Sequence, residues 1–70
     1  ESGIFEGISS DNTNSAIERI LTFFGVPDAS TQTREALELW HISAGDSMTD
    51  QYTEREAFRV GALLPEVNLA

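Results

Sequence analysis

The apolar positions of this chain fall into three stretches with a helical period, and the first stretch is the most clearly bounded. Its apolar residues recur at i, i+3, i+4 and i+7, the spacing of one stripe along a helix: Ile17, Ile20, Leu21 and Phe24. Ser15 and Glu18 have the S-x-x-E spacing of a capping box at a helix start. Gly25 can adopt the left-handed conformation that ends a helix, and Pro27 cannot continue one. We therefore predict a helix over residues 15–24.

The second stretch predicts a helix over residues 33–44. Apolar residues lie on one side of that helix, with Ala44 as a further candidate: Ala36, Leu37 and Trp40. Leu39 and Ile42 lie on the flank of this stripe. Gly45 is the expected end. Arg34 and Glu38 are four residues apart, so we expect them to pair on the exposed side. Trp40 is expected either at the centre of the core or as an interface anchor, because an indole buries a large area.

The third stretch predicts a helix over residues 53–64. Thr53 and Glu56 repeat the spacing of a capping box at its start. Gly61 weakens the middle of this helix, but a residue without a side chain also allows another helix to approach closely. Pro65 is the expected end of the segment.

The flanking segments predict an irregular N-terminal arm over residues 1–14 and a short C-terminal tail over residues 65–70. We expect the arm to pack on the core or on another subunit through its apolar residues: Ile4, Phe5 and Ile8. In the tail, Val67 and Leu69 are candidates for a short strand or a packing contact. Strand signals are otherwise poor. The predicted fold class is all-α, a small bundle of three short helices within residues 15–64.

The length of the chain and its lack of cysteine predict a partner. A chain of 70 residues buries only about 60% of its unfolded surface, and domains of this size usually need disulfides, a metal or oligomerisation. Cysteine is absent, and the one histidine, His41, has no second ligand at zinc spacing. We expect the large apolar side chains to be shared between a slender core and a protein partner, which is either a second copy or another chain: Ile17, Ile20, Leu21, Phe24 and Trp40.

The charge narrows the class of partner. Twelve acidic residues face four arginines, lysine is absent, and the net charge is -8. A phosphate backbone or an anionic membrane surface requires a basic face, so we expect neither direct nucleic-acid binding nor membrane binding. An acidic surface instead suits solubility or a basic partner. The sequence indicates no compartment.

The stretch Gly45-Asp46-Ser47-Met48 resembles a motif of a known family. It is similar to the G-x-D-S-L-like motif of acyl and peptidyl carrier domains, which are all-helical, acidic and of about this size. The resemblance implies a phosphopantetheine group attached to Ser47 at the start of a helix. It covers these residues alone, and the glycine here directly precedes the aspartate, whereas the family motif has one residue between them.

The other residues that could carry chemistry favour structural roles. His41, Asp46 and Ser47 are the residue types of a hydrolase triad, but all three come from one helix end and its turn. We expect His41 to be a partly exposed helix residue, and Asp46 and Ser47 to cap helices. The paired carboxylates indicate solvated helix faces: Glu35 with Glu38, and Glu54 with Glu56.

The sequence therefore predicts a non-enzymatic protein interaction module or a small structural subunit, with no cofactor, metal or small-molecule substrate. Two alternatives stay open. The first is a processed component of a large assembly such as a viral capsid, because the chain begins with Glu1 instead of Met and has an apolar arm. The second is a carrier-like domain modified on Ser47.

Overall fold

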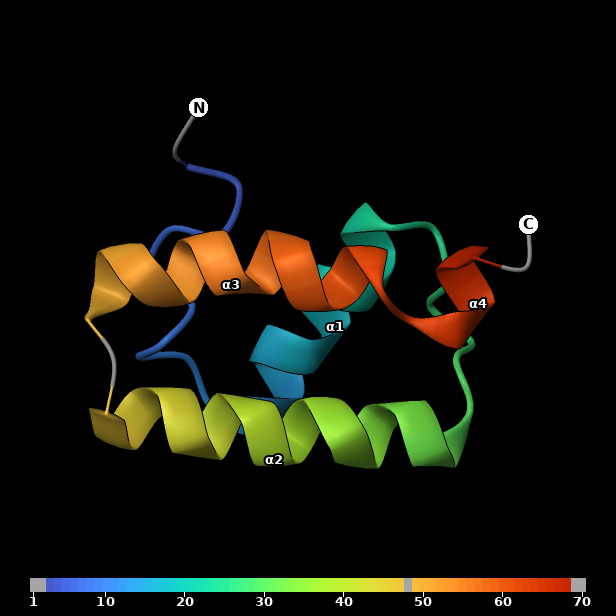
Figure 1. Cartoon of the computed structure of the whole chain (residues 1–70), viewed down its shortest axis with the longest axis horizontal. Coiled ribbons are helices and arrows are strands. Elements are labelled where there is room, and N and C mark those ends of the chain that lie inside the picture. Colours follow the sequence, from blue (N-terminus) through green and yellow to red (C-terminus); the bar gives the residue numbers. More distant parts are fainter. Residues whose placement is uncertain (1–2, 48, 69–70) are drawn as a thin grey trace.

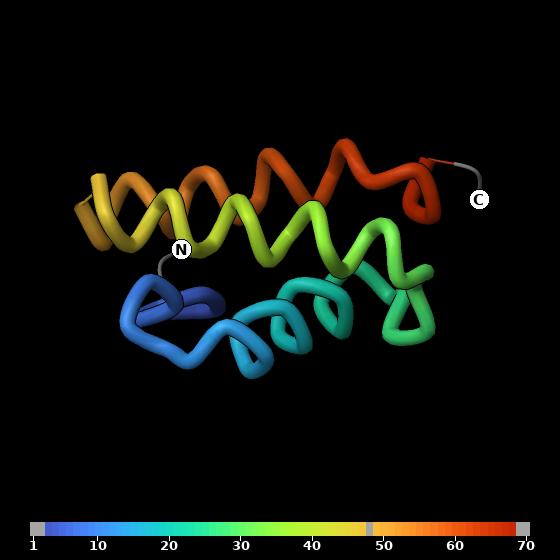
Figure 2. The backbone as a smooth tube through the Cα atoms, turned by 90° about the horizontal axis from the view of Figure 1, so that it is seen from below, coloured from blue at the N-terminus to red at the C-terminus, as the bar shows by residue number. Residues whose placement is uncertain are grey.

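The computed structural model describes residues 3–47 and 49–68. Their helices are α1 (Thr13–Phe23), α2 (Thr31–Ser47), α3 (Asp50–Ala62) and the short α4 (Pro65–Asn68), and no strand forms among these residues. α2 and α3 run antiparallel beside each other, and α1 crosses one side of the pair and contacts both (Figures 1 and 2). The prediction of a small all-α bundle is confirmed.

The start of α1 lies earlier than predicted. The side chain of Asn12 accepts the backbone N–H of Ser15 at 2.9 Å, so Asn12 is the N-cap and the helix begins at Thr13. Ser15 therefore lies within the first turn, and the predicted capping box of Ser15 and Glu18 is wrong. The earlier start adds two residues at the beginning of α1 and places Thr13 beside His41.

The end of α1 forms as predicted. Gly25 has a φ of 78°, which is the left-handed region. Its N–H donates to the carbonyl of Thr22 at 3.1 Å, and the N–H of Val26 donates to the carbonyl of Leu21 at 2.9 Å. These two hydrogen bonds are those of a Schellman motif, which satisfies carbonyls that the helix end would otherwise leave unpaired.

α2 is longer than predicted at its C-terminal end. It continues through Gly45, which keeps a negative φ, and ends at Ser47, so Gly45 is not the stop and Asp46 and Ser47 are not caps. A glycine commonly ends a helix by adopting the left-handed conformation, which Gly45 does not adopt. At the other end, the hydroxyl of Ser30 accepts the N–H of Thr33 at 3.2 Å and caps α2.

α3 also starts earlier than predicted. The hydroxyl of Thr49 accepts the N–H of Tyr52 at 3.2 Å and is the N-cap, so the capping box predicted for Thr53 and Glu56 is wrong. Thr53 is instead buried within the helix, where its hydroxyl donates to the carbonyl of Thr49 at 2.9 Å. Pro65 begins α4 and Val67 is helical rather than extended, while Leu69 lies outside the described residues.

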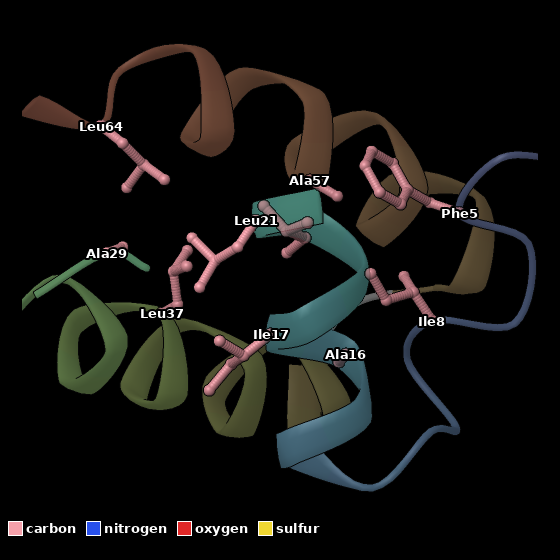
Figure 3. Packing of buried hydrophobic residues seen from close by; sticks show 10 residues of the cluster. Phe5, Ile8, Ala16, Ile17, Leu21, Ala29, Leu37, Ala57 and Leu64 are labelled. Atoms are coloured by element: carbon pink, nitrogen blue, oxygen red, sulfur yellow. The ribbon is translucent and has the colours of Figure 1, made fainter. Parts of the chain in front are cut away.

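The buried apolar residues form a single cluster among the helices and the arm (Figure 3). α2 and α3 lie on one side of the molecule, and α1 lies with the arm on the other (Figure 2). Its buried apolar members come from the arm, from the three longer helices and from the loops: Phe5, Ile8, Ala16, Ile17, Ile20, Leu21, Ala29, Leu37, Ala57 and Leu64. The arm therefore packs on the core of its own chain through Phe5 and Ile8. Trp40 lies partly buried at the margin of this cluster rather than at its centre.

Candidate docking surfaces

Most of the side chains predicted to bind a partner lie inside the molecule. Ile17, Ile20 and Leu21 are buried in the core, whereas Phe24 and Trp40 are partly exposed. In this fold a partner could reach only Phe24 and Trp40 of the five. Partner binding by these residues stays a prediction, and the apolar surface that the fold does expose is made by other side chains.

The first exposed surface is aromatic. Phe23 at the end of α1 and Phe58 on α3 have ring centroids 5.5 Å apart, and both rings contact the buried Phe5 of the arm at 5.4 and 4.7 Å. Ile4 is half-exposed beside Phe23. We call these exposed side chains, Ile4, Phe23 and Phe58, the aromatic patch. Phe23 lies off the main stripe of the first predicted helix, and that position is the sequence signal for this surface.

A shallow hollow of about 400 Å³ adjoins the aromatic patch. Ile4 and Phe23 line it together with Glu18, Arg19 and Thr22. Its charged groups already have partners, because Arg19 pairs with Asp11 at 2.7 Å and Glu18 pairs with an arginine of α2 at 2.7 Å. The hollow therefore has an apolar wall and a rim whose charges are locally balanced.

The arginine that pairs with Glu18 is Arg34, which was expected to pair with Glu38. Its guanidinium instead turns toward α1 and also donates to the carbonyl of Pro27 at 2.5 Å and, through Nε, to that of Ala29 at 3.3 Å. The pairing predicted for Arg34 and Glu38 is wrong. A guanidinium has several N–H donors in a fixed geometry. Toward α1 these donors meet both the carboxylate of Glu18 and two carbonyls of the loop before α2, whereas Glu38 would offer a carboxylate alone.

The second exposed surface is the outward side of α2. Leu39 is 69% exposed and Ile42 is 49% exposed, although both are large and apolar. Glu35, Glu38 and Asp46 share this side of the helix, since the five positions are spaced i, i+3, i+4, i+7 and i+11. We call these five residues the α2 stripe. None of its three carboxylates forms an ion pair with a described residue.

Glu66 joins α4 to the start of α2. Its carboxylate accepts the backbone N–H of Ser30 at 3.1 Å and the hydroxyl of Thr33 at 2.8 Å. These hydrogen bonds favour the charged form, and they lower the pKa of Glu66 to about 2. The contact ties the C-terminal turn to the second helix, and it is a structural rather than a chemical feature.

The candidate catalytic residues do not converge. His41 is buried rather than partly exposed, because the arm passes over it: its Nε2 donates to the carbonyl of Ile8 at 2.8 Å, and its Nδ1 lies 3.2 Å from the hydroxyl of Thr13. Ser47 is the last residue of α2, and its hydroxyl donates to the carbonyl of Ser43 at 2.9 Å. Ser47 therefore does not lie at a helix start, the position that the resemblance to carrier domains implied.

Among residues 3–47 and 49–68, no group of three or more His, Asp or Glu side chains is placed to hold a metal ion. In the same part of the chain, no helix is both long enough and apolar enough to cross a bilayer.

No protein-family model matches the chain, and neither a search of curated proteins nor a search of solved structures found a match.

Proposed function

We propose that this chain is a non-enzymatic structural module that assembles with a second copy of itself through the aromatic patch. The observation that carries the proposal is the exposure of Ile4, Phe23 and Phe58 side by side, around a phenylalanine that the chain does bury. Apolar side chains that gather in one place on the surface of a small domain are typical of an interaction site. Aromatic residues in particular are enriched at such sites.

The balanced charges beside the patch favour a second copy as the occupant. Each copy carries a net charge of -8, which opposes association in general. At the hollow, however, Glu18 and Arg19 each have an ion-pair partner within the same chain. Two copies that meet there therefore bring together apolar surface and compensated charge. The carboxylates of the α2 stripe, which have no ion pair among the described residues, lie on a different helix.

The self-association is expected to be weak. Fully burying one large apolar side chain contributes about 1.5–3 kcal/mol, and association must also offset the lost freedom of the two partners. The side chains of the patch are already about half covered within the monomer. We therefore expect a dimer that forms at high protein concentration and dissociates on dilution.

Sedimentation-velocity analysis from low micromolar to near-millimolar protein tests the proposal. The mean mass of the native chain is expected to rise toward that of a dimer, and Phe23→Ser is expected to abolish the rise. Leu39→Ser removes an exposed leucine on α2 and should leave association unchanged. Because Phe23 also packs on Phe5, Ile4→Ser provides a second variant whose side chain lies at the end of the arm. A native chain that stays monomeric throughout this range overturns the proposal.

A further inference from the structure

We propose that the α2 stripe is a docking site for a basic amphipathic helix of another protein. The site would hold a helical segment that carries apolar residues one turn apart, with lysine or arginine one turn further on either side. This proposal uses a surface separate from the aromatic patch and does not rest on self-association.

The placement of α2 leaves this surface free. The inward side of the helix is occupied, since Thr33, Leu37, His41 and Ala44 are buried. Leu39 and Ile42 point away from that side and make an apolar centre one turn long. Leu39 and Ile42 lie outside the core cluster of this chain, and adjoining exposed apolar side chains with a polar rim are typical of an interaction site.

The charges around the apolar centre determine the chemistry of the occupant. Glu35 lies one turn before Leu39, and Asp46 lies one turn after Ile42, with Glu38 between them along the helix. The one arginine of α2, Arg34, is held against α1 by Glu18 and by loop carbonyls. The apolar centre is therefore flanked by carboxylates that no described arginine neutralises.

A basic amphipathic helix complements both the apolar centre and the carboxylates around it. Its apolar residues would cover Leu39 and Ile42, and its cations would meet the carboxylates at both ends and fix its orientation. A second copy of this chain would bring its own acidic surface against the same carboxylates, and nucleic acid or anionic lipid would be repelled in the same way. The complementarity thus selects a positively charged protein segment.

Titration of the isotope-labelled chain with a synthetic peptide tests the proposal, followed by amide NMR shifts and by calorimetry. The peptide has leucines on one helical face and lysines on the other, and a scrambled peptide of the same composition is the control. We expect the amide shifts to concentrate on residues 35–46. Leu39→Ser and Ile42→Ser are each expected to weaken binding by roughly tenfold.

Matched variants separate specific docking from general attraction between opposite charges. Glu38→Gln should weaken binding of the peptide and reduce its salt dependence, whereas Glu54→Gln on α3 removes one charge elsewhere and should have little effect. Phe23→Ser, in the aromatic patch, should leave peptide binding unchanged. Equal binding of the scrambled peptide overturns the proposal, as do shifts centred on the aromatic patch. Shifts on α2 that appear when the protein is concentrated without peptide would assign the surface to a second copy and also overturn it.

Discussion

Gly61 on α3 lies against the ring of Phe24, the residue that follows α1. It is buried, and a Cβ atom there would meet the ring of Phe24. Alanine favours a helix over glycine by about 1 kcal/mol, but overpacking of a core costs about 1–3 kcal/mol. We therefore expect Gly61→Ala to destabilise the fold by about 1 kcal/mol, because the contact outweighs the helix preference. Urea denaturation followed by circular dichroism measures the change.

A substitution of Phe24 tests whether its ring causes that destabilisation. In a Phe24→Leu background, a shorter side chain leaves room for the new methyl group, so Gly61→Ala should then cost less or become stabilising. If Gly61→Ala stabilises the native chain as well, the ring moves aside freely and the close approach does not constrain the sequence.

His41 and Trp40 show what the sequence does not indicate at the scale of residues. Both lie on the second predicted helix, and their burial depends on which segment covers each side of it. The arm covers His41 through the carbonyl of Ile8, while Trp40 stays at the margin of the core. Long-range packing determines where an irregular arm crosses a helix, and the period of the apolar positions does not encode that packing.

At the scale of elements, substitutions can distinguish Asn12, the N-cap of α1, from Ser15, the residue predicted to cap this helix. Asn12→Ala removes the side chain that accepts the N–H of Ser15 and is expected to destabilise the fold by about 1 kcal/mol. Ser15→Ala changes a residue in the first turn whose hydroxyl has no such role, so its effect should stay within a few tenths of a kcal/mol. Thermal melts of the two variants make the comparison, and an equal loss in both would contradict the assignment of the cap.

The two ends of α1 show which helix ends can be predicted from the sequence. Several residues around the start of α1 can cap a helix, Asn12 and Ser15 among them, and spacing alone does not select one. The C-terminal end of α1 was predicted correctly because Gly25 adopts the left-handed conformation that ends a helix, and Pro27 cannot continue one. The apolar period identified the three longer helices, but it could not indicate which exposed side chains would gather into the aromatic patch.

At the scale of the whole molecule, Glu66 couples the C-terminal turn to the start of α2, and this coupling depends on pH. The pKa of Glu66 is lowered to about 2 in the folded chain from an ordinary value of 4.5, so the folded state favours the carboxylate. The resulting stabilisation is fully present above pH 4.5 and is lost as the pH falls toward 2. Glu66→Gln is therefore expected to lower the melting temperature at neutral pH, with a difference from the native chain that shrinks on acidification.

The difference between the two chains matters more than either melting curve, because other carboxylates also titrate in this range. Glu35→Gln on the outward side of α2 is the control, since its carboxylate has no ion pair among the described residues. A gap between the native chain and Glu66→Gln that is constant from neutral to acidic pH would show that the hydrogen bonds to Ser30 and Thr33 do not depend on the charge of Glu66.

The two proposed surfaces should respond to salt in opposite directions within one molecule. Self-association brings together two chains that each carry a net charge of -8, so screening should strengthen it. Docking of a basic helix on the α2 stripe draws opposite charges together, so the same screening should weaken it. Sedimentation and peptide titration over one series of salt concentrations compare the two. If salt weakens both, the contact between copies is electrostatic and the aromatic patch does not drive it; if salt strengthens both, the carboxylates of α2 do not select the peptide.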